Sequence, residues 1–148
     1  MKTLYSSDKK KILRQLEEQY GIKKLPYLLL QFGKEKIRLY SGNLSTDELF
    51  KLDKTLRIET AGLYTFKKQN EEIRLTIDAL SPFKNQITQN ILEINDKQAL
   101  EWFKGNDLDI KSDRNFKVLK NQGDLIGCGK STEERITNFM PKERRIKN

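Results

Sequence analysis

The residues whose types and spacing come closest to a known chemistry are Gly123–Thr132, with the sequence Gly-Asp-Leu-Ile-Gly-Cys-Gly-Lys-Ser-Thr. In a P-loop, a glycine five positions before the glycine of Gly-Lys-Ser lets backbone N–H groups surround nucleotide phosphates. Here Asp124 holds that position, Gly123 lies one residue out of register, and a carboxylate would repel phosphate. Only 17 residues follow Ser131, too few for a further strand with a magnesium-binding acid. We therefore expect no ATPase or GTPase activity and no nucleotide ligand.

The chain also lacks the residues that other kinds of catalysis need. The chain contains no histidine, which is the commonest general base and metal ligand. Its one cysteine, Cys128, permits neither an internal disulfide nor a Cys/His zinc site, and we expect it to be a small buried residue rather than a nucleophile. Asp107, Asp109 and Asp113 are loosely spaced like a calcium loop but lack its glycine and terminal glutamate. We interpret them as turn residues, and expect no enzyme, no cofactor and no metal.

Charge is the main compositional signal. The formal net charge is +8 and the isoelectric point is about 9.5, which favours a polyanionic partner, nucleic acid first and an acidic membrane surface second. No apolar stretch follows the basic residues of the first eleven positions, and the longest apolar run, Leu28–Leu30, is too short to span a bilayer. A single thiol fits a reducing compartment. The sequence predicts a soluble cytoplasmic protein without a membrane partner.

The first half has the pattern of an α+β module. Helical periodicity predicts a helix over residues 7–20, which Ser6 or Ser7 can cap and Gly21 ends. Ser45 and Glu48 form a capping box for a second helix. Alternation of apolar with basic residues, clear in residues 36–40, indicates strands. The expected strands are Tyr27–Phe32, Lys36–Tyr40, Arg57–Lys67 and Glu72–Leu80.

The second half has the pattern of a small barrel. Ser81-Pro82 is expected to end the first module, which gives two domains, 1–86 and 87–148. Short strands are expected at residues 91–94, 116–119, 124–127 and 135–139, separated by Gly, Asn and Asp turns. One helix, capped by Asn95 or Asp96, is expected to turn Ala99, Leu100 and Phe103 inward. A β-barrel with a single helix is the natural packing of such a pattern.

Three segments of the second half resemble a PUA domain, a small pseudo-barrel that binds structured RNA. These are Glu101–Leu108, Gly123–Lys130 and Asn138–Ile146. They are most similar to the RNA-binding tail of the Nop/Sun rRNA methyltransferase group. In the first half, Gly62–Phe66 and Arg74–Leu80 resemble the pre-PUA module of the Nip-type ribosome-biogenesis factors. The chain has no Gly-rich cofactor loop, so methyl transfer does not carry over from the methyltransferases.

The resemblance implies an α+β fold, with an N-terminal module of helix, hairpin, helix and hairpin followed by a PUA-type β pseudo-barrel. It implies that the segment Leu125–Lys130 is a barrel strand whose glycines allow a sharp bend or a close approach of RNA. The loop after the second-half helix is implied to lie near the RNA backbone, with the carboxy-terminal tail beside it. Arg144-Arg145 suits phosphate because guanidinium groups bind it bidentately. The candidate RNA-binding residues are Lys104, Gly105, Asn106, Lys130, Arg135, Lys142, Arg144, Arg145 and Lys147.

Two further surfaces remain open on the sequence alone. Lys10 and Arg14 are four residues apart and form either a second phosphate-facing stripe or an ordinary solvated helix face. Trp102 and Phe103 could stack on bases, but adjacent helical residues point in different directions. We expect Phe103 in the core, and Trp102 stays unassigned.

The function predicted from these features is non-enzymatic RNA binding. The expected ligand is structured rRNA, or else tRNA, in ribosome biogenesis or RNA modification. The alternative is a protein-interaction scaffold or adaptor for an RNA methyltransferase or a ribosome-assembly protein. An exposed apolar patch on the first module would favour this alternative.

Overall fold

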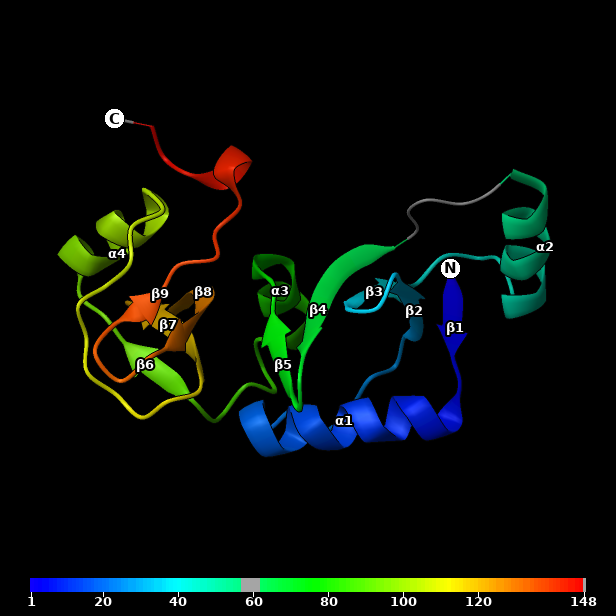
Figure 1. The fold of residues 1–148 in the computed structure, drawn as a ribbon, viewed down its shortest axis with the longest axis horizontal. Coiled ribbons are helices and arrows are strands. Elements are labelled where there is room, and N and C mark those ends of the chain that lie inside the picture. The colour runs from blue at the N-terminus through cyan, green and yellow to red at the C-terminus, as the bar shows by residue number, and fades with distance from the viewer. Residues whose placement is uncertain (57–61, 148) are drawn as a thin grey trace.

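A computed structural model describes residues 1–56 and 62–147. Within these ranges the chain forms two sheets, and a short helical segment lies between them along the chain (Figure 1). The first sheet has the order β1-β2-β3-β4-β5 with antiparallel neighbours. Its strands are β1 (Lys2–Leu4), β2 (Leu28–Phe32), β3 (Lys36–Tyr40), β4 (Leu63–Gln69) and β5 (Glu72–Leu75). The mixed α+β class expected from the sequence is confirmed.

Helix α1 (Ser6–Tyr20) covers one face of this sheet (Figure 1). Ile12, Leu16 and Tyr20 recur every four residues and are fully buried against the sheet residues of the same core. Burial of such a side chain stabilises a fold by about 1.5–3 kcal/mol. Gly21 ends the helix in the left-handed region, with φ 83°. The expected serine cap is wrong, because Tyr5 is the N-cap and makes no side-chain cap hydrogen bond.

Helix α2 (Thr46–Leu56) follows the predicted capping box. The Ser45 N–H donates to Glu48 Oε2 at 2.7 Å and the Glu48 N–H donates to Ser45 Oγ at 3.2 Å, which satisfies two of the free donors of the first turn. Leu49 is buried, whereas Phe50 and Leu52 are 53% and 38% exposed. The helix stands at the far end of the molecule from the second sheet (Figure 1).

The segment after β5 is helical, so the expected strand over residues 72–80 is too long. A 3-10 turn spans Ile77–Ala79 and helix α3 spans Leu80–Phe83. Pro82 lies within this helix, in the first turn, where a backbone N–H has no acceptor in any case, so it does not interrupt the helix. Of the expected strand over residues 57–67, residues 57–61 lie outside the described part of the chain, and the remainder begins β4.

The second sheet has the order β6-β7-β8-β9. β6 (Ile91–Glu93) is parallel to β7 (Phe116–Asn121), while β8 (Asp124–Ser131) and β9 (Ile136–Thr137) are antiparallel to their neighbours. Helix α4 (Asp96–Phe103) crosses between β6 and β7 and starts at an Asn95–Gln98 capping box. Gln122 and Gly123 both have positive φ, 47° and 85°, at the tight β7–β8 turn. A last 3-10 turn, Lys142–Arg144, precedes the carboxy terminus.

The two sheets share a core. Phe116, Val118 and Cys128 of the second sheet belong to the same buried cluster as Leu16 and Phe66 of the first half. Because side chains alternate along a strand, the other face of β7 places Leu119 in a second cluster with Trp102. Strand β7 is therefore covered on both faces, and the buried core crosses the domain boundary expected between residues 86 and 87.

Candidate nucleic-acid interface

The loop after α4 is held by one carboxylate. The Asn106 side-chain amide donates to Glu101 Oε2 at 2.7 Å, and Lys104 Nζ lies 3.5 Å from Glu101 Oε1. These contacts, the Asn106 hydrogen bond first, lower the pKa of the Glu101 carboxyl. The carboxylate therefore holds two of the three predicted loop residues, Lys104 and Asn106, at the end of the helix.

The tail lies against this loop. The Arg145 side chain crosses Gly105, where an added Cβ would come within 2.5 Å of Arg145 Cδ. Arg145 Nε donates to the Met140 carbonyl at 3.0 Å, and the Ile146 N–H donates to the Phe103 carbonyl at 2.8 Å. The loop and tail that the resemblance places together are neighbours in the structure. Lys142 and Lys147 are exposed on the same tail.

The remaining predicted basic residues are occupied elsewhere. Arg135 lies 3.2 Å from Asp109 and 3.7 Å from Asp107. Lys130 lies 3.6 Å from Glu72, and Arg144 lies 2.9 Å from Asp78. The last two pairs join the second half to the first, so Lys130 and Arg144 face the junction rather than the Gly105 loop.

Trp102 is a core residue, while Phe103 is only half-buried. The exposed fraction of Trp102 is 1%, and that of Leu100, expected inside, is 47%. The indole is accommodated by the glycines of β8: a Cβ at Gly129 would lie 2.7 Å from the ring, and one at Gly127 would overlap the indole nitrogen. The segment that resembles a P-loop is thus a barrel strand, as the resemblance implies, and Gly127 and Gly129 make room for the tryptophan ring.

The sequence reasoning missed a face of the first sheet that combines basic and aromatic side chains. The Arg38 guanidinium lies 5.7 Å from the ring centroids of both Phe32 and Tyr64, and Lys36 Nζ lies 5.5 Å from Tyr64. The Arg74 guanidinium stacks on Phe139 of the second half at 4.3 Å. Cation–aromatic pairs of this kind can also stack on bases. The alternation of residues 36–40 was the available signal, but it shows nothing of the partner rings.

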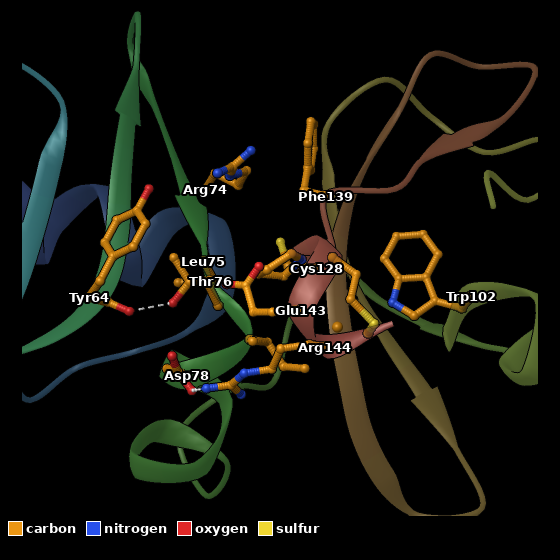
Figure 2. A pocket seen from close by; sticks show the side chains of 14 residues that line it. Tyr64, Arg74, Leu75, Thr76, Asp78, Trp102, Cys128, Phe139, Glu143 and Arg144 are labelled. Carbon is orange, nitrogen blue, oxygen red and sulfur yellow. Dashed lines mark hydrogen bonds and ion pairs between the residues drawn. The ribbon is translucent and has the colours of Figure 1, made fainter. Parts of the chain in front are cut away.

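A cavity of about 170 Å³ lies where this face meets the second sheet. In Figure 2, Arg74 and Phe139 face each other at one end and the Asp78–Arg144 pair lies at the other. Both halves contribute to the lining, which consists of Tyr64, Arg74, Leu75, Thr76, Ile77, Asp78, Trp102, Gly127, Cys128, Phe139, Met140, Pro141, Glu143 and Arg144.

Cys128 is buried in the wall of this cavity. Burial raises the pKa of its thiol to about 11, so the group is protonated at neutral pH and is a poor nucleophile. Tyr20 is a partner of the thiol and donates its own hydroxyl proton to the Ile73 carbonyl. The residue is therefore part of the packed core, as expected.

The acids considered as metal ligands have other partners. Asp107 and Asp109 pair with Arg135, and Asp113 lies 2.7 Å from Lys117 Nζ. Residues 1–56 and 62–147 contain no group of three or more potential metal ligands. In the same ranges no helix has the length and apolar character needed to cross a membrane.

The second half of the chain matches a known protein family. Residues 89–146 match the family model described as the methyltransferase RsmF PUA domain. Together with the curled second sheet, this match shows that residues 89–146 are a PUA-type RNA-binding domain. The relationship is to the Nop/Sun-type methyltransferases, as the resemblance implies.

A curated relative carries the same likeness. Over 107 residues the chain is 29% identical to a ribosomal RNA small subunit methyltransferase F from Psychromonas ingrahamii. The match covers 68% of this chain but 22% of the relative, so the chain spans about a fifth of the length of that protein.

A solved structure extends the fold likeness to both halves. A hypothetical protein from the hyperthermophilic archaeon Pyrococcus horikoshii superposes with a TM-score of 0.58 at 13% identity. The superposition covers 94% of this chain and 92% of that protein. At this identity the likeness concerns the fold alone.

Proposed function

We propose that this protein binds structured RNA without catalysing a reaction, with rRNA as the favoured ligand and tRNA as the second, in the cytoplasm. The observation that carries the proposal is the match of residues 89–146 to the PUA domain of an rRNA methyltransferase. The contact between Gly105 and Arg145 supports it, because it unites the loop with a basic tail that carries Lys142 and Lys147. The role would be in ribosome biogenesis or RNA modification.

The test is binding of a structured rRNA fragment and of tRNA, measured by fluorescence anisotropy at several salt concentrations. A Lys142→Ala/Arg145→Ala variant is expected to bind more weakly and to lower the slope of log affinity against log salt by about 2, one unit for each lost phosphate contact. Arg144 is left in place because its Asp78 pair links the two halves.

Lys10→Ala/Arg14→Ala is the matched control, since it removes the same two side-chain types from exposed positions of α1. Its affinity should stay close to that of the unmodified protein. Equal weakening of both variants would mean that overall charge, or a phosphate-facing stripe on α1 as well as the tail, determines binding. No binding to either RNA would refute the proposal.

A second candidate function is the protein-interaction scaffold. Apolar side chains are exposed just before α2 and on it, namely Leu44, Phe50 and Leu52, and at the start of β4, namely Leu63, with exposed fractions of 38–53%. A Phe50→Ser/Leu52→Ser variant tests this candidate by affinity purification with and without ribonuclease. A partner protein that still co-purifies after ribonuclease treatment, but not with the variant, supports a scaffold. A partner that is lost on ribonuclease treatment is bridged by RNA.

A further inference from the structure

The cavity between the two sheets has the size of one six-membered ring. Its volume is about 170 Å³, and a protein cavity of about 150 Å³ accommodates benzene. Leu75 and Ile77 line it from the first half, while Phe139 and Met140 line it from the second. Apolar walls with a few polar groups are typical of a small-ligand site.

Two N–H donors in this lining lack an acceptor within the described part of the protein. Trp102 Nε1 and Arg74 Nε are both buried and unpaired, and Figure 2 shows the indole nitrogen turned toward the cavity. A buried donor without an acceptor costs about 1–3 kcal/mol. A ligand with a carbonyl oxygen would satisfy such a donor, so the lining favours an acceptor-bearing ring.

The charges around the cavity favour a neutral ligand. Arg74 and Arg144 are matched by Asp78 and Glu143, and Arg144 is already paired with Asp78 at 2.9 Å. A phosphate would therefore meet a balanced lining, whereas an uncharged planar ring could stack beside the Arg74–Phe139 pair.

The exposed sheet face leads to this cavity. Tyr64 both lines the cavity and lies beneath Lys36 and Arg38. A nucleotide whose base entered the cavity would have its phosphates near these two cations. The arrangement thus fits a base that is attached to an RNA strand.

We propose that the cavity binds one unstacked pyrimidine base, whose O2 carbonyl accepts from Trp102 Nε1 and Arg74 Nε. Uracil and cytosine both carry the O2 carbonyl, adenine carries no carbonyl, and either purine has a second ring that exceeds the space. The inference rests on the proposed RNA-binding function, and it assigns to the first half a part in recognition.

The single tryptophan of the chain makes the test direct. Its one indole N–H cross-peak in a ¹H–¹⁵N spectrum reports the cavity without ambiguity. Uridine or cytidine is expected to shift this peak saturably at millimolar concentration, and adenosine should not. An unmoved peak, with the cavity holding only solvent, overturns the proposal, as does an equal response to adenosine or guanosine.

Variants locate the response. Arg74→Ala should weaken nucleoside binding about tenfold, while Lys67→Ala, on the neighbouring strand outside the lining, should leave it unchanged. Both variants are first compared with the unmodified protein by urea unfolding. If both weaken binding alike, the Arg74 assignment is wrong.

The source of the base is separated by comparing uridine with a uridine-containing RNA. Tighter binding of the RNA, lost when the uridine is replaced by an abasic nucleotide, supports a base within a strand. RNA binding with an unmoved indole peak overturns the cavity assignment but leaves the proposed function intact. A shift of the indole peak by the nucleoside without any RNA binding would support the cavity assignment and refute the proposed function.

Discussion

Cys128 couples the stability of the core to pH. Burial raises the pKa of this thiol from 9.0 to about 11, so between these values the unfolded chain loses a proton that the folded chain retains. The stabilisation is complete below pH 9 and is lost as the pH rises to 11. Two pKa units correspond to about 3 kcal/mol. Burial also raises the pKa of the Tyr20 hydroxyl, which adds a loss in the same direction at higher pH.

Urea unfolding at pH 7, 9 and 10.5 measures this loss. The free energy of unfolding should fall less steeply above pH 9 in a Cys128→Ala variant than in the unmodified protein. Tyr20 would account for the fall that remains in the variant. Parallel pH profiles would show that the thiol does not contribute.

The sequence did not show which individual side chains are buried or stacked on one another. The α4 periodicity predicted Phe103 in the core and left Trp102 unassigned. This prediction is wrong, because Trp102 is the buried residue and Phe103 is half-buried, and a helix of eight residues gives too short a pattern to separate the two. The buried indole depends on Gly127 and Gly129, which lie on a different strand. Arg74 was not singled out, since its stacking on Phe139 joins residues that are 65 positions apart.

At the scale of elements, the contact between the α4 loop and the tail depends on Gly105. This residue has φ 92° and Arg145 lies over its Cα. Gly105→Ala is expected to lower the free energy of unfolding by about 1–3 kcal/mol, because the backbone strain and the displaced guanidinium add. Both the free energy of unfolding, measured with urea, and the RNA affinity should fall.

Gly123→Ala is the control for this loop. It has a similar φ of 85° but nothing within 4 Å of the added Cβ, so it carries the backbone strain alone. The difference between the two variants measures the Arg145 contact. Equal losses, or a Gly105→Ala loss that is unchanged in an Arg145→Ala background, would show that the contact has no energetic role.

Elements with strong local signals were predicted well. The α1 periodicity, the Ser45 capping box and the alternation in β3 each specify their structure from neighbouring residues. Strand β1 was missed because three residues are too short for a pattern. The helical turn after β5 was missed because Ile77 and Leu80 also continue an apolar strand. The packing of Phe83 against Phe66, with ring centroids 5.6 Å apart, is a contact that the sequence pattern does not show.

At the scale of the molecule, the shared core predicts that both halves unfold together. Native-state hydrogen exchange should give the same opening free energy for the slowest amides of α1 and β7. Ile12→Ala, in the α1 part of the core, should lower both by about 2–5 kcal/mol. Leu100→Ala, at a 47% exposed position, should change neither. Lower protection in β7 alone would indicate halves that open independently.

The segment between the halves is fixed rather than tethered. The Thr88 N–H donates to the Tyr20 carbonyl at 2.8 Å, and Gln86 Oε1 accepts from the Lys23 and Lys24 N–H groups at 3.0 and 2.9 Å. Two binding sites on a rigid body are held at a fixed distance from each other. A ligand with two contact points spaced like the two sites makes the second contact without the entropy loss that a flexible linker would add. A ligand with a different spacing gains no affinity from the second site. For the RNA contacts proposed on the two halves, such a rigid connection would make affinity depend on the distance between the two contact points along the RNA.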